Sequence, residues 1–506
     1  MFIRQKKNKS GSTSIQIISK NGGSYKILKS IGSSSSEEGI SILMHQARFE
    51  LGQLQAQPSL FVSDEDTIIQ GYLETISNYN VQVIGPELIF GKIYDHIGYN
   101  SINEDLFRYL VISRLAFPLS KLKTLDYLQR FQGIQISASS VYRFLDKLQK
   151  RHKEIVEQIA YQHTLKITGG KISIVFYDMT TLYFESSDED DLRKAGFSKD
   201  GKHSNPQIFL GLLVSVGGYA IGYDMFEGNI FEGHTLIPFL EKMSARFNLS
   251  KPIVVADAGL LSKPNIEALQ EKQYEYIIGA RLKSEPTVIK TQIEKAHLKD
   301  GQSIAINKGN YRLIVAHSNV RSAKDAHNRK RGLQRLEKQI QKGKLTKTHI
   351  NNRGYNKYLK LKGEVSVSID YDKYNKDAIW DGLKGYITNC TLPPKSIIEN
   401  YRHLWQIEKA FRMSKTDLKI RPIYHRLADR IEAHICISFV AYSIYKELER
   451  VLKKEKSTMS LVEATEQTQN MYQLNVTLPD SKRKKNILLK MTEKQIELMK
   501  IIAKNY

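Results

Sequence analysis

Two aspartates stand where carboxylates could hold a metal ion. Asp178 ends the run ISIVFYD (172–178), and Asp257 ends the run PIVVAD (252–257). Continuous β-branched and aromatic runs are typical of strands that are buried on both faces. An Asp in such a place can simply begin a turn, because Asp is a favoured turn residue. Two of them on neighbouring strands would instead project from the same edge of one sheet, and we expect this second arrangement.

A third acid, Glu408, lies in the segment NYRHLWQIEKAFRMSKTDL (400–418), which has the spacing of an amphipathic helix. Phe411 and the other apolar residues of this segment recur at helical spacing, which predicts that Glu408 faces the buried side. A buried carboxylate is costly unless it is paired or bound to a metal. The segment therefore indicates either a salt bridge from Glu408 to Arg412 or Lys415, or a metal ligand.

Carboxylates that converge from distant segments suit the cleavage and transfer of phosphodiesters. Two Mg²⁺ ions about 4 Å apart can activate the attacking oxygen and stabilise the leaving oxygen of such a reaction. Mg²⁺ prefers hard oxygen ligands and retains several waters, so a few carboxylates suffice. We therefore expect Mg²⁺, with Mn²⁺ as a substitute, to be held by Asp178, Asp257 and Glu408, which would also be the catalytic residues.

The charge balance points to a polyanionic partner. The chain has 506 residues, with 76 Lys and Arg against 53 Asp and Glu, which gives a formal net charge of +23. Such an excess raises the local concentration of polyanions, and nucleic acid is the usual polyanion because each neutralised phosphate releases a counterion. Within 321–362 there are 14 basic residues and two acids. That segment is either a solvated loop or an insertion that contacts DNA.

The sequence gives no sign of a membrane or an oxidising compartment. Its longest apolar run, 208–223, is too short for a membrane span and is broken by Gly217 and Gly218. The N-terminal segment lacks the apolar region of a signal peptide. The two cysteines, Cys390 and Cys436, exclude a disulfide framework and a Cys-based zinc site. We expect a cytoplasmic, nucleoid-associated protein of bacterial type that has no membrane partner.

The order of predicted elements around the two aspartates indicates the fold class. A strand ending at Asp178 is followed by a hairpin with its turn at Gly217, a helix at 235–247, the strand ending at Asp257, a helix at 264–272 and a strand at 274–281. This order predicts an α/β fold with a mixed sheet of the ribonuclease-H type. A doubly wound nucleotide fold would need a Gly-rich loop after its first strand, and none is present.

Changes in composition divide the chain into six predicted parts. A basic N-terminal β-unit precedes a helical DNA-binding region, the catalytic core is interrupted by a basic, β-rich insertion, and a helical tail follows the core. The predicted bounds are 1–55 for the β-unit, 56–165 for the helical DNA-binding domain, 166–285 for the first part of the core, 286–390 for the insertion, 391–450 for the helical part of the core that carries Glu408, and 451–506 for the helical tail.

Several motifs, taken in order, resemble a known family. They are YDMTTLYFE (177–185), GFSKDGK (196–202), EGNIFEGHTL (227–236), VVADAGLLS (254–262) and the block Y-x-x-x-W-x-I-E-x-x-F-R-x-x-K (401–415). With these motifs the sequence resembles the insertion-sequence DDE transposases of the IS-four superfamily, from about residue 165 to residue 440.

The last block corresponds to that family's Tyr-Arg-Glu-Lys signature, with one departure. Tyr401, Glu408 and Lys415 match at the signature spacing, but Leu404 stands at the Arg position. On a continuous helix Arg402 would lie about 200° away from that position, so we expect that it cannot simply replace the missing Arg.

The resemblance implies the activity, partners and site of the protein. It implies a DNA transposase that cuts transposon ends and transfers them into target DNA, acting as a synaptic homodimer on two inverted-repeat ends. It assigns metal binding to Asp178, Asp257 and Glu408, and phosphate binding to Tyr401 and Lys415. Two further DNA contacts are expected from Trp405, which could instead be a helix–sheet contact, and from Arg412.

Two other functions remain open from the sequence. A ribonuclease-H-like nuclease or junction resolvase would use the same carboxylates but would cut without joining. A DNA-binding regulator descended from a transposase would have lost catalysis, and the presence of all three acids, Asp178, Asp257 and Glu408, speaks against it.

Overall fold

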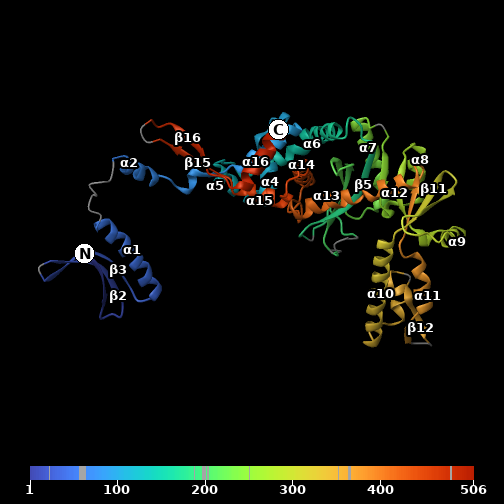
Figure 1. The fold of residues 1–506 in the computed structure, drawn as a ribbon, viewed down its shortest axis with the longest axis horizontal. Helices are drawn as coiled ribbons and strands as arrows, with labels where there is room; N and C mark the ends of the chain where they lie inside the picture. The colour runs from blue at the N-terminus through green and yellow to red at the C-terminus, as the bar shows by residue number, and fades with distance from the viewer. Residues whose placement is uncertain are drawn as a thin grey trace. The chain divides into compact units, whose positions relative to one another are not determined.

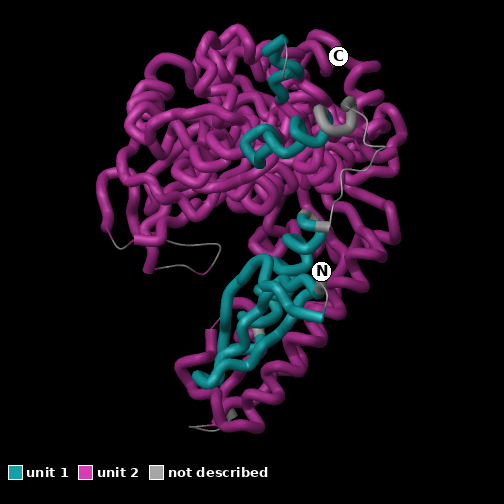
Figure 2. Tube along the Cα trace, turned by 90° about the vertical axis from the view of Figure 1, so that its left-hand side faces the viewer, with its two compact units in different colours: residues 1–80, 476–485 teal, residues 81–475, 486–506 magenta. Residues whose placement is uncertain are grey.

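The structure is a computed structural model of the whole chain. It describes residues 1–21, 23–55, 64–186, 188–196, 201, 204–249, 251–351, 353–362, 366–478 and 481–506. Two compact units are distinguished in Figure 2: residues 1–80 with 476–485 form the first, and residues 81–475 with 486–506 form the second.

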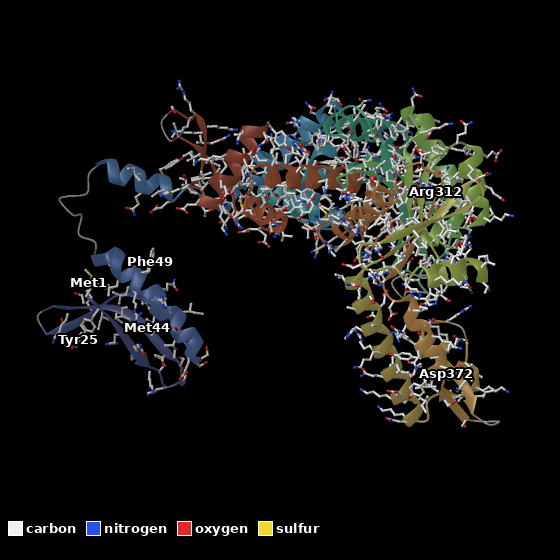
Figure 3. The ribbon with its side chains drawn as sticks, turned by 45° about the vertical axis from the view of Figure 1, so that its right-hand side comes forward. Met1, Tyr25, Met44, Phe49, Arg312 and Asp372 are labelled. Carbon is white, nitrogen blue, oxygen red and sulfur yellow. The ribbon has the colours of Figure 1, made fainter. Side chains whose placement is uncertain are left out.

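The first unit contains the β-unit that the sequence predicts. Its strands β1 (Phe2–Lys7), β2 (Thr13–Asn21) and β3 (Ser24–Ser34) form an antiparallel sheet. Helix α1 (Glu37–Gln55) packs against this sheet, and the isoleucines Ile15 and Ile17 of β2 are fully buried. A second helix, α2 (Asp64–Leu73), follows. Large apolar side chains remain exposed on this unit, among them Tyr25 and Phe49 (Figure 3).

An eight-stranded mixed sheet forms the centre of the second unit. Its order is β10-β11-β14-β9-β8-β5-β6-β7. The strands are β5 (Ile174–Tyr183), β6 (Gln207–Ser215), β7 (Ala220–Glu227), β8 (Ile253–Ala256), β9 (Tyr276–Ala280), β10 (Ser303–Lys308), β11 (Tyr311–His317) and β14 (Leu383–Thr388). Strands β5, β8 and β9 are parallel, and the other pairs are antiparallel. The predicted ribonuclease-H-like mixed sheet is confirmed.

The turn between β6 and β7 shows why two glycines occur in succession. Gly217 and Gly218 have φ angles of 89° and 83°, a conformation that side chains with a Cβ rarely adopt. The apolar run of 208–223 is therefore a hairpin within the sheet, as predicted. Among the residues that the structure describes, no helix is both long enough and apolar enough to cross a membrane.

Each face of the sheet is covered by its own set of helices. On one face α7 (Leu236–Phe247) and α8 (Lys263–Glu271) pack in a core that includes Tyr177 and Val254. On the other face α12 (Pro394–Arg402), α13 (Trp405–Thr416) and α14 (Ala428–Lys454) pack in a core that includes Phe176 and Val255. The alternation follows from the strand geometry, since successive side chains point to opposite faces. The central sheet is thus buried on both sides (Figure 1).

Helices before and after the sheet form a domain that packs onto α14. The N-terminal group comprises α3 (Lys92–Ile97), α4 (Asp105–Ala116), α5 (Lys121–Gln132) and α6 (Ala138–Ile167). The C-terminal group comprises α15 (Leu461–Gln469) and α16 (Glu493–Asn505). The predicted tail at 451–506 is not wholly helical, because it also contains β15 (Tyr472–Thr477) and β16 (Lys484–Leu488). Strand β15 pairs with β4 (Val81–Val83), a partner about 390 positions away that the sequence pattern did not reveal.

The predicted β-rich insertion at 286–390 differs from the structure. Helix α9 (Thr287–Lys295) opens this interval, and the strands β10, β11 and β14 continue the central sheet beyond β9. The projecting part lies between β11 and β14 and consists of α10 (Asn319–Gln341), the hairpin β12 (Leu359–Lys362)–β13 (Ser366–Ile369) and α11 (Tyr371–Lys376) (Figure 1). It is mainly helical. Strands are present in this interval, but the pairing of β14 with β9, which joins three of them to the central sheet, depends on tertiary structure.

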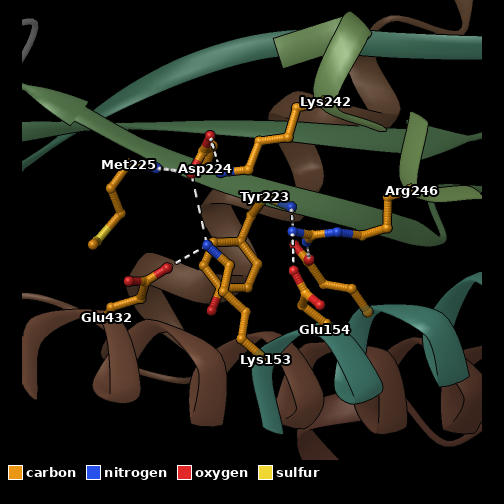
Figure 4. A network of polar contacts seen from close by, with 9 residues as sticks. Lys153, Glu154, Tyr223, Asp224, Met225, Lys242, Arg246 and Glu432 are labelled. Carbon is orange, nitrogen blue, oxygen red and sulfur yellow. Dashed lines mark hydrogen bonds and ion pairs between the residues drawn. The ribbon is translucent and has the colours of Figure 1, made fainter. Parts of the chain in front are cut away.

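A network of buried ion pairs fixes α6 to its neighbours (Figure 4). The buried ammonium of Lys153 forms an ion pair with Glu432 of α14 and lies 3.7 Å from Asp224 of β7. Arg246 of α7 pairs with Glu157 and Glu154 of α6, the latter at 3.0 Å. These pairs connect the helical domain to the edge strand of the sheet.

Lys153→Ala should destabilise the protein by about 3–5 kcal/mol, because it leaves the part-buried carboxylate of Glu432 without its cation, whereas Asp224 keeps its ion pair with Lys242 at 2.8 Å. The matched control is Lys150→Ala on the same helix. Lys150 is exposed and lies 3.3 Å from Asp429, so its loss should cost no more than about 1 kcal/mol. Urea unfolding measures both, and equal effects of the two substitutions would contradict a structural role for the Lys153 network.

Candidate active site

The first aspartate lies inside a strand and not at its end. Strand β5 runs from Ile174 to Tyr183, so the prediction that Asp178 ends it is wrong. The neighbouring strand β8 is shorter, and the last residues that pair are Tyr177 and Ala256. Asp178 and Asp257 are each the next residue after this pair. The parallel register therefore places both aspartates at the C-terminal end of β8, as the sequence predicted for neighbouring strands.

Both aspartates project toward the same layer of helices. Asp178 alternates with Tyr177 and so shares the face of Phe176, and Asp257, which has extended backbone angles, shares the face of Val255. This face is covered by α12 and α13, whose Ile397 and Ile407 pack in the same core. The third predicted acid comes from that layer.

Glu408 lies on α13, but its environment differs from the prediction. The segment 400–418 is two helices, since α12 ends at Arg402 and α13 begins at Trp405. Glu408 is exposed, whereas Ile407 and Phe411 are buried. Each step along a helix turns by about 100°, so with Ile407 toward the sheet the side chain of Glu408 lies to one side of the buried stripe. The prediction that Glu408 lies on the buried stripe is therefore wrong.

One cavity of about 340 Å³ brings several predicted residues together. Asp257, Tyr401, Trp405 and Glu408 line it. Trp405 is 52% exposed there, so it is not a helix–sheet contact. Asp178, Arg412 and Lys415 are not among the lining residues. The cavity is also lined by Arg402, and by residues that the sequence did not single out, among them His317, Arg321 and Lys384.

Tyr401 holds the carboxylate of Asp257. Its hydroxyl donates a hydrogen bond of 2.9 Å to Oδ1 of Asp257. Burial and the charge of Asp257 raise the pKa of Tyr401 well above its ordinary value, so the phenol remains a donor. Gly279 on β9 makes this contact possible, because a Cβ there would lie 2.6 Å from the Tyr401 hydroxyl. The sequence assigned Tyr401 to DNA phosphates, whereas the structure shows it oriented toward a predicted metal ligand.

Lys384 on β14 supplies a cation between two of the predicted acids. Its ammonium lies 4.3 Å from the centre of the Tyr401 ring. Burial and the nearby Arg321 lower its pKa, while the charges of Asp257 and Glu408 act in the opposite direction. No sequence signal marked Lys384, since a single Lys in a strand usually belongs to a solvated face.

Arg402 lies in the same cavity as the Leu404 that replaces the signature Arg. The sequence argument against Arg402 assumed one continuous helix through both positions. The structure has two helices there, with α12 ending at Arg402 and α13 beginning at Trp405, and both Arg402 and Leu404 border the cavity. Arg402 is exposed and borders the cavity that contains Asp257 and Glu408.

A second cavity of about 500 Å³ continues from the first toward the projecting part. Asp257, Arg321, Lys384 and Tyr401 line both cavities. The second is further lined by Arg281 and Lys283 at the end of β9, and by Tyr355 and Trp380 of the projecting part. Basic and aromatic side chains thus extend from the aspartates to α10, an arrangement suited to a charged polymer with planar groups.

The predicted ligands fit a divalent cation by type but are not gathered around one point. Carboxylate oxygens are the donors that Mg²⁺ prefers, and Asp257 and Glu408 share a cavity in which Lys384 is their cationic neighbour. Within the described part of the chain, no three His, Cys, Asp or Glu side chains lie close enough to hold one metal ion together. The motif at 196–202 lies largely outside the described residues.

Comparison with known families identifies the chain. The family model described as the transposase DDE domain matches residues 169–444, more than half of the chain. The chain belongs to the transposase DDE domain family. It is a DNA transposase, a polynucleotidyl transferase of a family whose members generally depend on divalent metal ions. The match spans β5, β8 and α13, and so includes the segments that carry all three predicted acids.

Solved transposases show distant similarity to this chain. A cryo-EM structure of the piggyBac transposase synaptic complex with hairpin DNA is 10% identical, with a TM-score of 0.38, and covers 83% of this chain and 81% of its own. The Mos1 transposase paired-end complex with the left transposon end is 10% identical, with a TM-score of 0.16, and covers 48% of this chain and 67% of its own. None of the curated proteins matches it.

Tyr401→Phe should lower metal-dependent DNA cleavage by this transposase about 10- to 100-fold, because it removes the hydrogen bond that orients Asp257. The matched control is Tyr386→Phe. The Tyr386 ring lies 4.9 Å from that of Tyr401, but its hydroxyl has no hydrogen-bond partner within the described chain. Cleavage measured across a Mg²⁺ titration should need more metal in the first variant alone. An unchanged Mg²⁺ requirement in Tyr401→Phe would contradict the orienting role.

Proposed function

We propose that this transposase cuts transposon ends and joins them to target DNA with Asp178, Asp257 and Glu408 as its catalytic metal ligands. The observation that carries the proposal is the pairing of β5 with β8, which aligns Asp178 with Asp257 beneath the layer that bears Glu408. The metal is Mg²⁺, for which Mn²⁺ can substitute. Two such ions, when bound, would stabilise the attacking and leaving oxygens of the phosphodiester.

The chain's own residues would bind and orient the reacting DNA. Tyr401 holds Oδ1 of Asp257 by a hydrogen bond, and Oδ2 would remain for the metal ion. Arg321, Lys384 and Arg402 line that cavity and would hold the phosphates beside the cut bond. In this proposal Arg402 makes the phosphate contact that the signature Arg would make, since Leu404 stands at the position of that Arg. The DNA is also contacted by three residues of α13, which are Trp405, Arg412 and Lys415.

The projecting part offers a surface for the DNA backbone. Lys324, Arg331, Arg335, Lys338 and Lys342 follow one another at spacings of seven, four, three and four residues along α10, which places them on one face of the helix. All five are exposed and none forms an ion pair within the described chain. The opposite side of α10 packs on a small core that contains Leu336 and Tyr358. We name these five residues the α10 stripe.

The substrates and assembly extend the proposal. The DNA partners are two inverted-repeat transposon ends and a target duplex, and the active species is a synaptic homodimer. The order of motifs favours the insertion-sequence group of the IS-four superfamily. The matched structure of piggyBac transposase is a synaptic complex with hairpin DNA, which makes a paired complex the form to test.

Glu408→Gln should abolish cleavage and joining while end binding stays nearly unchanged, because the amide removes one metal-binding charge and leaves the basic surfaces intact. Glu399→Gln is the matched control, since Glu399 is an exposed residue of α12 that lines neither cavity. Cleavage, strand transfer from pre-cut ends and end binding are measured separately. Loss of binding together with cleavage would mean that Glu408 is structural, and cleavage without joined product in the wild type would favour a nuclease.

Lys338→Gln combined with Lys342→Gln should flatten the salt dependence of DNA binding. Each phosphate contact contributes about 0.9 to the slope of log affinity against log salt, so the slope should fall by up to about 1.8. Lys295→Gln combined with Lys299→Gln makes the same change at the same spacing outside the α10 stripe and should leave the slope unaltered. Equal slopes in the wild type and in both double variants would mean that the α10 stripe does not contact DNA.

A further inference from the structure

A third cavity, of about 570 Å³, lies away from the predicted carboxylates. It is bounded by the end of α4, the beginning of α5, the segment 419–425 that follows α13, and His434 of α14. We name it the α5 cavity. The guanidinium of Arg421 at its wall lies 5.5 Å from the ring of Tyr183, the last residue of β5. The wall of the α5 cavity thus includes the segment that follows α13, and one of its residues contacts the end of β5.

Two buried cations line the α5 cavity without an acidic partner. Arg114 is 6% exposed and Lys121 is 7% exposed. Within the described chain Lys121 forms no hydrogen bond or ion pair, and Arg114 makes one contact of 3.5 Å to the carbonyl of Leu418. None of the described residues that line the cavity is Asp or Glu.

The other buried cations of the described chain are all paired. Lys153 pairs with Glu432, Arg193 with Asp190 at 2.7 Å, and Lys446 with Glu449 at 2.5 Å. A buried charge is costly unless it is paired. Among the described residues, the two buried cations that lack an acidic partner therefore both lie in the α5 cavity.

Like charges in the α5 cavity oppose one another. Burial and the charge of Arg114 lower the pKa of Lys121 well below its ordinary value. Burial, Lys121, Arg430 and Arg114 lower the pKa of His425 to about 4. The same surroundings lower the pKa of His434. An anion in the cavity would relieve this repulsion and restore the charge of Lys121.

The backbone of the α5 cavity is also suited to an anion. The residues from Ser120 to Lys123 that line it form the N-cap and first turn of α5, a helix of 12 residues. The N-terminus of a helix carries partial positive charge and free N–H donors, and phosphate groups bind there. Two independent features, a helix N-terminus and a buried cation without a partner, converge on the same space.

We propose that the α5 cavity binds a phosphate group of the DNA backbone. Its mouth favours a polymer over a free anion, since the exposed Lys123 and Lys419 continue the positive charge outward. Tyr424, 73% exposed at the same mouth, offers a ring on which a base can stack. The inference rests on the proposed function, because it assumes that the bound phosphate belongs to the backbone of the DNA. The site would position the duplex relative to α13 and β5, and Lys121 is a positioning residue.

Lys121→Met tests the proposal through two changes of opposite sign. The free protein should unfold at a higher temperature, because an apolar side chain replaces an unpaired buried cation. Binding of a transposon-end duplex without divalent metal should weaken about 10-fold, because one charge-assisted hydrogen bond to phosphate is lost. The matched control is Lys446→Met, which breaks the buried pair with Glu449. It should unfold at a lower temperature and bind DNA as the wild type does.

Methylphosphonate substitution identifies the source of the phosphate. A set of duplexes is prepared, each with one phosphate replaced by a neutral methylphosphonate. At one linkage the replacement should weaken DNA binding by the wild type but not by Lys121→Met. Additive losses at every linkage would overturn the proposal. Inorganic phosphate that stabilises the wild type but not Lys121→Met, with no coupled linkage, would replace DNA by a free anion and also overturn it. Asp257→Asn separates this proposal from the proposed function. It should abolish cleavage, while the dependence of DNA binding on both Lys121 and the one linkage stays as in the wild type.

Discussion

The parallel pairing of β5 with β8 is the constraint on which the site depends. It ends at Tyr177 and Ala256, and the next residue of each strand is an aspartate. Because both side chains then fall on the face of Phe176 and Val255, they meet the layer formed by α12 and α13. A shift of one residue in either strand would move its carboxylate to the opposite face. The two buried faces of the sheet fix this register, since slippage would expose apolar side chains.

The basic residues of the chain occur in three different environments. Some cations are structural, and the Lys153 network shows that these are paired with carboxylates. Others form the α10 stripe, whose side chains are exposed and make no ion pair with any residue that the structure describes. A third set, Arg114 and Lys121, is buried in the α5 cavity and has no acidic partner among the described residues. An unpaired buried cation lowers stability, which is the physical argument for a ligand that the chain itself does not supply.

Arg402 is the last residue of α12, and Leu404 lies between α12 and α13. Both residues border one cavity, Arg402 with an exposed side chain and Leu404 with a buried one. Tyr401 lies just before the break and contacts Asp257 through space left by Gly279. The local geometry at residues 401–405 therefore decides which side chains reach the carboxylates. A helical repeat read from sequence cannot contain this information.

The sequence by itself determined the family motifs, the alternating strands and the mixed sheet, because hydrophobic periodicity and turn residues are local properties. It also selected Asp178 and Asp257 as neighbours, since each follows a buried run. Only the tertiary structure decided that β10, β11 and β14 extend the central sheet and that Glu408 is exposed. Pairing partners, helix breaks and cavity-lining residues such as Lys384 and Lys121 depend on contacts between distant segments. Those contacts are set by the packing of the whole chain, and no short stretch of sequence encodes them.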